Sequence, residues 1–244
     1  MANPTKKPAL ILVHGFRGSP IGLQEIAQIL EQAGYQVLIP PIPPFAGAQK
    51  LPSYTPDSYA RYLADFVKQQ DLNRPILIGH SMGSLVVAAT LKYYPELFHQ
   101  KAILMSPISK RTAVPFRMIA PLSALTPKAA VDYITTKFLF TPHDKALLKH
   151  VLEVTHDCSN DQPPVKSEVI QAAKFSTSYA ITDFHIPKSV LLLAGANDRL
   201  ISQAQTRAAA QQLNAKLDFL PNTGHLHNYE QPRETANAII DFIK

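Results

Sequence analysis

Short apolar runs recur along the chain, and most are followed by a loop and then by a segment with apolar residues at three- and four-residue spacing. Short apolar runs between Gly, Pro and polar positions are typical of buried strands, and the longer spacing is typical of amphipathic helices. Their alternation predicts a mostly parallel sheet flanked by helices. The predicted strands are residues 9–13, 36–40, 75–79, 102–106, 189–194 and 216–220. The predicted helices are residues 21–33, 55–70, 82–94, 202–213 and 232–243.

The alternation stops after the fourth predicted strand, and the next strand follows only after a stretch much longer than a simple crossover needs. Segments 129–140 and 144–156 within this stretch have a helical pattern, although prolines interrupt the region repeatedly. We therefore expect a helical cap inserted after the fourth strand. The predicted division is a core of residues 1–106 and 188–244 with a cap of residues 107–187.

The amino-acid composition excludes several classes of protein. The 244 residues, with 46% hydrophobic and 17% charged, suit one globular domain and exclude wholesale disorder, collagen-like repeats and coiled coils. Cys158 is the only cysteine, so no intramolecular disulfide is expected, and the sequence offers no zinc-binding cluster. The polar start leads into only five apolar residues at 9–13, too few for a signal peptide, which favours a cytoplasmic location.

The chain has 24 basic and 18 acidic residues, a formal charge of +6. Such an excess suits either an anionic partner or simple solubility. The sequence lacks an RNA-binding motif, a zinc finger or a long basic run with interleaved aromatics, so no nucleic-acid partner is expected. The apolar segment 113–125 has basic neighbours, which allows contact with an anionic membrane surface; the alternative is an ordinary cap helix that lines a pocket.

The sequence Gly79-His80-Ser81-Met82-Gly83 lies between a predicted strand and a predicted helix. This GxSxG pattern is the nucleophile elbow, in which a sharp turn holds the serine in strained dihedral angles. The turn leaves no room for side chains two positions on either side of the serine, and glycine occupies both places. Ser81 is therefore the candidate nucleophile.

A serine hydroxyl needs an imidazole to take its proton and a carboxylate to orient that imidazole. With this elbow the chain order is serine, acid, histidine. His225 lies just beyond the last predicted strand, after Gly224, and is the preferred base, with His227 as the alternative. Asp198 follows the fifth predicted strand and is the preferred acid. The competing explanation is that Asp198 caps the next helix or pairs with Arg199.

An oxyanion that develops on the substrate needs two backbone N–H donors. Met82 begins the helix after the serine, so its amide is predicted to be one of them. Phe16, which follows the first strand in Val13-His14-Gly15-Phe16, is predicted to supply the second. We expect the His14 ring to brace this loop rather than act as a base.

Together, Val13-His14-Gly15-Phe16, Gly79-His80-Ser81-Met82-Gly83, Gly195-Ala196-Asn197-Asp198 and Gly224-His225 resemble the α/β-hydrolase superfamily over nearly the whole chain. The pattern is similar to compact serine carboxylesterases and monoacylglycerol-lipase-like members, which place a small helical cap where the insertion falls. The sequence departs from the family pattern in two ways. The segment before the first strand is short, which suggests that the usual antiparallel first pair of strands is absent. Ser84 occupies a position where many members carry glycine.

The resemblance implies a hydrolase that cleaves carboxylic esters of small or apolar acyl groups through an acyl-enzyme, without metal or organic cofactor. A serine at the elbow argues against dehalogenase and epoxide hydrolase chemistry, which needs a carboxylate nucleophile. Thioester hydrolysis, C–C bond hydrolysis and a binding role without catalysis remain alternatives. Apolar residues of the insertion suggest an apolar acyl or aryl group, namely Phe116, Met118, Ile119, Leu122, Phe138 and Leu139.

Overall fold

The computed structural model describes residues 7–111, 147, 149, 151 and 164–244. The predicted helix 129–140 and most of the predicted helix 144–156 lie outside this part of the chain. The described strands form a six-stranded, all-parallel sheet in the order β2-β1-β3-β4-β5-β6. They are β1 Leu10–Val13, β2 Val37–Leu38, β3 Ile76–His80, β4 Lys101–Met105, β5 Ser189–Gly195 and β6 Lys216–Leu220. All six predicted strands are confirmed, although β2 is only two residues long.

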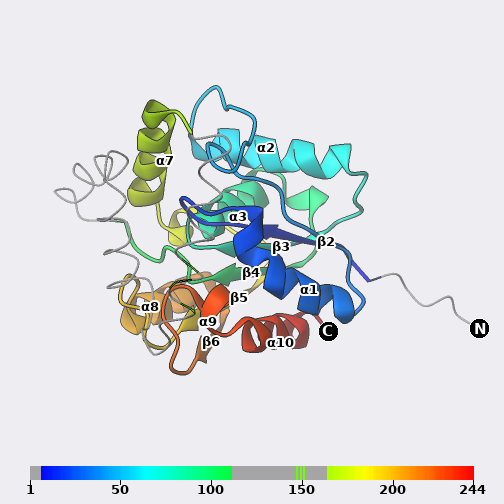
Figure 1. Cartoon of the computed structure of the whole chain (residues 1–244), viewed down its shortest axis with the longest axis vertical. Helices are drawn as coiled ribbons and strands as arrows, with labels where there is room; N and C mark the ends of the chain where they lie inside the picture. The colour runs from blue at the N-terminus through cyan, green and yellow to red at the C-terminus, as the bar shows by residue number, and fades with distance from the viewer. Residues whose placement is uncertain (1–6, 112–146, 148, 150, 152–163) are drawn as a thin grey trace, which may run out of the picture.

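Alternate strand residues contact the two opposite layers of helices, so both sheet faces are buried. In β1, Ile11 and Val13 belong to the hydrophobic cluster that contains α2 and α3, whereas Leu10 and Leu12 belong to the cluster of α1 and α10. Figure 1 shows these two helix pairs on opposite sides of the sheet. Burial on both faces explains why the strands are continuous apolar runs rather than polar and apolar alternations.

The helices agree with the predicted ones to within a few residues, with two additions. The long helices are α1 Gln24–Gln32, α2 Pro56–Gln69, α3 Met82–Tyr93, α7 Lys166–Ser178, α8 Gln203–Leu213 and α10 Pro232–Ile243. The predicted first helix is divided, because a 3-10 turn at Pro20–Leu23 precedes α1. The prediction missed α7 and the short α9, His227–Glu230.

The described part of the insertion packs against the core. Phe175 of α7 lies 4.7 Å from Tyr59 of α2 between ring centroids. Where the insertion leaves and rejoins the sheet, the Ile181 N–H donates to the Ile108 carbonyl at 2.9 Å, and the Arg111 guanidinium makes two hydrogen bonds to Asp183. These contacts hold the two ends of the insertion together. The division of the chain into a core and a separate cap of residues 107–187 stays a prediction.

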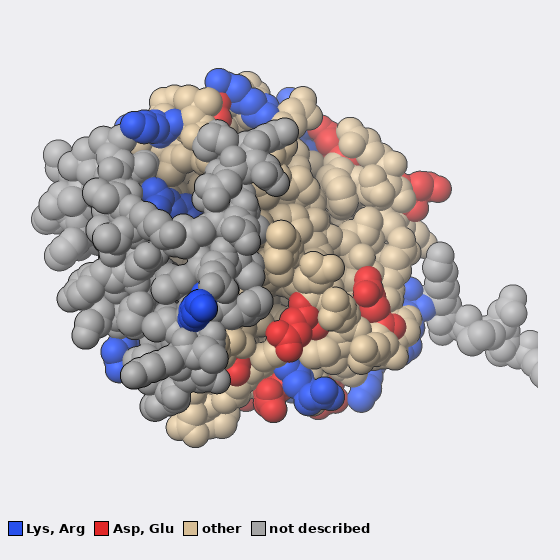
Figure 2. Space-filling view, in the orientation of Figure 1, with Lys and Arg blue, Asp and Glu red and all other residues tan. Residues whose placement is uncertain are grey.

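Among the described residues, no helix is long and apolar enough to cross a membrane. The described surface in Figure 2 carries acidic and basic side chains mixed along its lower edge, beside a mostly uncharged middle. Segment 113–125, on which the predicted membrane contact rests, lies outside the described residues. That contact therefore stays a prediction.

Candidate active site

Ser81 occupies a sharp turn between β3 and α3. Its dihedral angles, φ 53° and ψ −117°, are strained for a residue with a side chain. A Cβ at position 79 would overlap the carbonyl of Gly83, and a Cβ at position 83 would overlap the carbonyl of Val13 at the end of β1. The two glycines therefore allow α3 to start directly against the sheet. This geometry agrees with the predicted nucleophile elbow.

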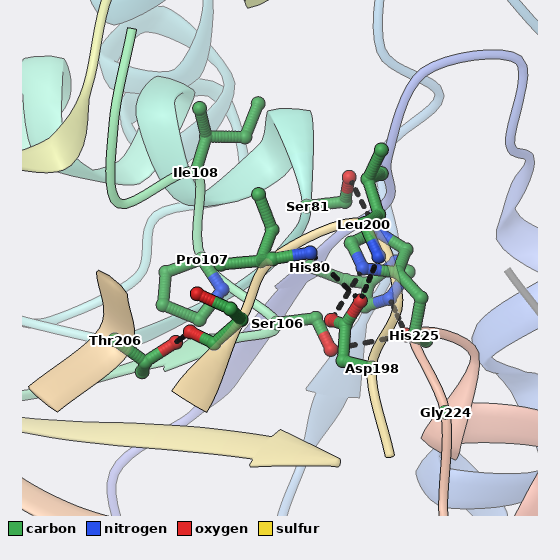
Figure 3. A network of polar contacts seen from close by, with 12 residues as sticks. His80, Ser81, Ser106, Pro107, Ile108, Asp198, Leu200, Thr206, Gly224 and His225 are labelled. Carbon is green, nitrogen blue, oxygen red and sulfur yellow. Dashed lines mark hydrogen bonds and ion pairs between the residues drawn. The ribbon is translucent and has the colours of Figure 1, made fainter. Parts of the chain in front are cut away.

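Ser81, His225 and Asp198 form a continuous series of hydrogen bonds, as Figure 3 shows. The Ser81 Oγ lies 2.9 Å from the His225 Nε2, and the His225 Nδ1 lies 2.8 Å from the Asp198 Oδ2. The two partners of the serine are buried, with 2% of His225 and 9% of Asp198 exposed. Residues from the ends of β3, β5 and β6 thus meet at one edge of the sheet, as their positions in the sequence predicted.

The carboxylate of Asp198 is held on both oxygens. While Oδ2 faces His225, Oδ1 accepts the backbone N–H groups of Leu200 and Ile201 at 2.8 and 2.9 Å. Burial by itself raises the pKa of this carboxyl, but the charge of His225 and the hydrogen bonds lower it below its ordinary value. Asp198 is therefore an ionised carboxylate at neutral pH, fixed toward His225. The next helix, α8, is capped by Ser202 instead.

The loop that carries His225 packs tightly against β5. A Cβ at position 195 would overlap the carbonyls of Thr223 and Gly224, so glycine is required at the end of β5. The Gly224 N–H donates to the Glu230 carboxylate of α9 at 3.0 Å. These contacts keep the loop close to Asp198.

The two predicted oxyanion donors belong to segments that adjoin Ser81. Met82 is the first residue of α3, so no earlier helical turn supplies a carbonyl for its N–H. A Cβ on Gly15 would lie 3.1 Å from the Ser81 Cβ, which places the loop of Phe16 directly beside the serine. The Phe16 ring packs edge-on against Phe45, with centroids 5.2 Å apart. The assignment of Phe16 and Met82 as an oxyanion hole stays a prediction.

His14 connects the loop after β1 to the proline-rich loop after β2. Its Nε2 accepts the Ile42 N–H at 2.8 Å, and its Nδ1 donates to the Gly15 carbonyl at 3.0 Å. Burial lowers the pKa of His14 to about 4, against the opposing effect of the Gly15 hydrogen bond. The ring is therefore neutral at pH 7 and braces the loop of Phe16, as predicted.

This neutral histidine makes stability depend on pH. The unfolded chain binds a proton at His14 near the ordinary pKa of 6.5, whereas the folded chain binds it only near 4. Unfolding therefore takes up a proton at His14, and this residue alone is expected to lower the free energy of unfolding by about 3 kcal/mol as the pH drops through this interval, in addition to the contributions of the other buried histidines, His80 and His227. Urea unfolding between about pH 7 and about pH 4.5 measures the slope. His14→Gln is the comparator: an equal slope in this variant would contradict the assignment.

Several residues near Ser81 were missed as candidates or assigned otherwise. Ser84 donates to the Ser81 carbonyl and accepts the Ile108 N–H at 3.2 Å, so this departure from glycine joins the elbow to the loop after β4. His227, the alternative base, is buried with its Nδ1 3.2 Å from the Thr235 hydroxyl. Ser106 ends the predicted strand 102–106 and is not among the predicted site residues, although its polarity at the end of an apolar run is a signal for a role there.

The arrangement is suited to moving a proton away from a serine hydroxyl. Because Asp198 accepts the proton on Nδ1, the Nε2 of His225 is left as an acceptor facing Ser81. Among the described residues, no group of three or more His, Cys, Asp and Glu side chains could hold a metal ion. The hydrogen bonds among Ser81, His225 and Asp198 are those that nucleophilic attack by a serine with a histidine as general base requires.

Comparisons with known proteins agree with this fold. The chain is 25% identical over 260 residues to the uncharacterized hydrolase YugF of Bacillus subtilis, covering 99% of this chain and 92% of that protein. It is 22% identical to the monoacylglycerol lipase ABHD6 of Homo sapiens, covering 98% and 76%. A thermophilic esterase from Thermogutta terrifontis superposes with a TM-score of 0.82 at 19% identity, covering 98% and 90%.

A second solved structure, the bromoperoxidase from Bacillus anthracis, superposes with a TM-score of 0.83 at 15% identity over 97% of this chain and 92% of that one. At such identities the superpositions support the fold, because one fold carries many chemistries. The family comparison covers all six described strands, since residues 10–238 match the Alpha/beta hydrolase family. The chain is a member of the alpha/beta hydrolase family.

Proposed function

We propose that this protein is a serine hydrolase that cleaves carboxylic esters of small or apolar acyl groups through an acyl-enzyme. The observation that carries the proposal is the hydrogen-bonded series of Ser81, His225 and Asp198 at a strained elbow. Strain at Ser81 destabilises the fold, so its presence beside an oriented imidazole favours a catalytic role.

In the first half of the reaction, the Ser81 oxygen forms a bond to the acyl carbon while His225 Nε2 takes the hydroxyl proton. The carbonyl π electrons move onto the oxygen, where the N–H groups of Met82 and Phe16 stabilise the negative charge. When the intermediate collapses, the ester C–O bond breaks and the imidazolium donates its proton to the leaving alcohol. Asp198 stabilises the imidazolium throughout.

In the second half, water replaces the alcohol. His225 takes a proton from the water, whose oxygen bonds to the acyl carbon, and the bond between Ser81 and the acyl group then breaks. The proton returns to the Ser81 oxygen, and the carboxylic acid leaves. The enzyme is restored without any change of oxidation state.

The names of the relatives support a hydrolase that acts on acyl esters. One is a monoacylglycerol lipase, and two from Mycoplasma pneumoniae are described as putative esterase/lipases. Thioesters and hydrolysable C–C bonds are alternatives, since the same residues would serve them. Two of the similar proteins have peroxidase names, a putative non-heme chloroperoxidase and a bromoperoxidase, and these names describe those proteins.

A series of p-nitrophenyl esters from acetate to palmitate tests the proposal. We expect hydrolysis of at least the short members, and the chain-length profile will report the size of the acyl pocket. A parallel series of acyl thioesters provides the comparison. Turnover of thioesters alone would replace the ester assignment, and no turnover of either series, with no labelling of Ser81 by a fluorophosphonate, would favour a binding protein.

A further inference from the structure

The backbone carbonyl of His225 accepts two side-chain hydrogen bonds inside the protein. The His80 Nε2 lies 3.0 Å from this oxygen, and the Ser106 Oγ lies 3.0 Å from it. Figure 3 shows His80 and Ser106 within the network of polar contacts around His225, with Ser106 below the Ser81 side chain in this view. Because a carbonyl oxygen has two lone pairs, its capacity to accept hydrogen bonds is used in full.

The two donors come from the strands that carry and neighbour the nucleophile. His80 ends β3 and immediately precedes Ser81, and Ser106 directly follows β4. His225, in contrast, lies on a loop beyond β6, at the far side of the sheet order. The packing of Gly195 and the hydrogen bond from Gly224 to Glu230 hold this loop against β5 and α9, but they do not tie the His225 backbone to β3 and β4 beside Ser81. The two donors supply that tie.

Ser106 combines a strained backbone conformation with a buried polar side chain. Its φ of 41° lies in the left-handed region, and the residue is fully buried. Its N–H donates to the Leu193 carbonyl of β5 at 2.8 Å. A strained, buried polar residue with no obvious part in the core persists where the surroundings require it, and here its hydroxyl points to His225.

His80 is suited to donate one hydrogen bond and carry no charge. Burial, with a smaller contribution from the positive charge of His225, lowers the pKa of His80 to about 3. The ionisable groups that act on it are His225, His14, Asp198 and, across a ring contact of 5.8 Å, His227. A neutral ring leaves the His225 imidazolium without a like charge beside it while the reaction proceeds.

We propose that Ser106 and His80 are positioning residues, which hold the backbone of His225 so that its Nε2 stays aligned with Ser81. This role rests on the proposed function, in which His225 is the base. Neither residue touches the reacting atoms. Their effect is on kcat, because a misplaced base lowers the rate of proton transfer more than it changes substrate binding.

Ser106→Gly separates positioning from folding. Glycine relieves the left-handed strain, so the thermal midpoint is expected to stay equal or rise, while the lost hydroxyl lowers kcat about tenfold with KM within about twofold. Ser106→Ala is expected to lower kcat by the same factor. The matched control is Ser109→Ala: Ser109 is also buried, but its hydroxyl donates to the Pro107 carbonyl, and kcat should be unchanged.

His80 is tested with a pair of variants. His80→Gln keeps an N–H donor at a position comparable to Nε2, and His80→Leu removes it. We expect His80→Gln to retain most of kcat and His80→Leu to lose about tenfold. The combination of His80→Leu with Ser106→Ala is expected to lose about a hundredfold or more, since no donor then remains.

The hydrogen bond between His225 and Asp198 gives a readout that needs no substrate. Its low-field proton NMR signal should be present in the wild type and in Ser109→Ala, and weakened or shifted in Ser106→Gly. A wild type that shows the signal but cleaves no ester would refute the proposed function and leave this comparison to decide the positioning role. The role is overturned if the signal is unchanged, or if kcat of the folded Ser106→Gly variant stays within about twofold of wild type.

Discussion

Ser81→Ala is expected to lower kcat/KM for an activated ester by about 10⁴-fold or more, to the level left by binding and the oxyanion donors alone. Alanine removes the oxygen that forms the acyl-enzyme and leaves His225 without its 2.9 Å partner. Initial rates with p-nitrophenyl acetate measure the loss. Intact-mass analysis after fluorophosphonate treatment should show one adduct on the wild type and none on the variant.

The strained backbone provides an internal control for this experiment. Ser81→Gly removes the same oxygen but tolerates φ 53° and ψ −117°, whereas Ser81→Ala keeps the strain. Both variants should be equally inactive, with Ser81→Gly more stable than Ser81→Ala by about 1 kcal/mol in urea unfolding. Residual activity above one hundredth of wild type in a folded, pure Ser81→Ala sample would show that another residue carries the reaction.

Asp198→Asn is expected to lower kcat by about 10³- to 10⁴-fold. The amide fits the space, and its oxygen can still accept the Leu200 and Ile201 N–H groups. Its NH₂ group then faces His225 Nδ1, which must act as an acceptor. The ring proton therefore moves to Nε2, and the nitrogen beside Ser81 can no longer take the serine proton.

Asp218→Asn is the matched control, since Asp218 is an exposed carboxylate on β6. It removes the same charge without altering the site, so its kcat should equal that of the wild type. If Asp198→Asn instead retained kcat within tenfold, another acid would have to orient His225. Asp157 and Asp161 of the insertion would then be the first to replace, because they also lie between Ser81 and His225 and so satisfy the chain order serine, acid, histidine.

Local sequence patterns predicted the strands, most of the helices and the elbow, because each of these features depends on a few neighbouring residues. Burial on both faces makes the strands continuous apolar runs, and the elbow needs glycine on either side of Ser81. The start of α1 was less predictable. Pro20 suits the first turn of a helix, but the segment through Leu23 is a 3-10 turn, and α1 itself starts at Gln24.

Features that depend on contacts between segments far apart in the sequence were harder to predict. α7 has a weaker amphipathic pattern than α1 or α2, and its packing on the core, for example of Phe175 on Tyr59, is seen only in the tertiary structure. The hydroxyl of Ser106 reaches His225 across a separation of 119 residues. No pattern within a short window carries such a contact, because it depends on the strand order.

The sequence by itself determined the parallel sheet, the elbow and the chain order of Ser81, Asp198 and His225, since strand periodicity and glycine spacing are local requirements. Only the tertiary structure decided that His225 rather than His227 faces Ser81, and that Ser106 and His80 hold the His225 carbonyl. These choices depend on how loops from different strands pack against one another at the edge of the sheet. Hydrogen bonds of that kind follow from three-dimensional proximity, which residue spacing along the chain does not encode.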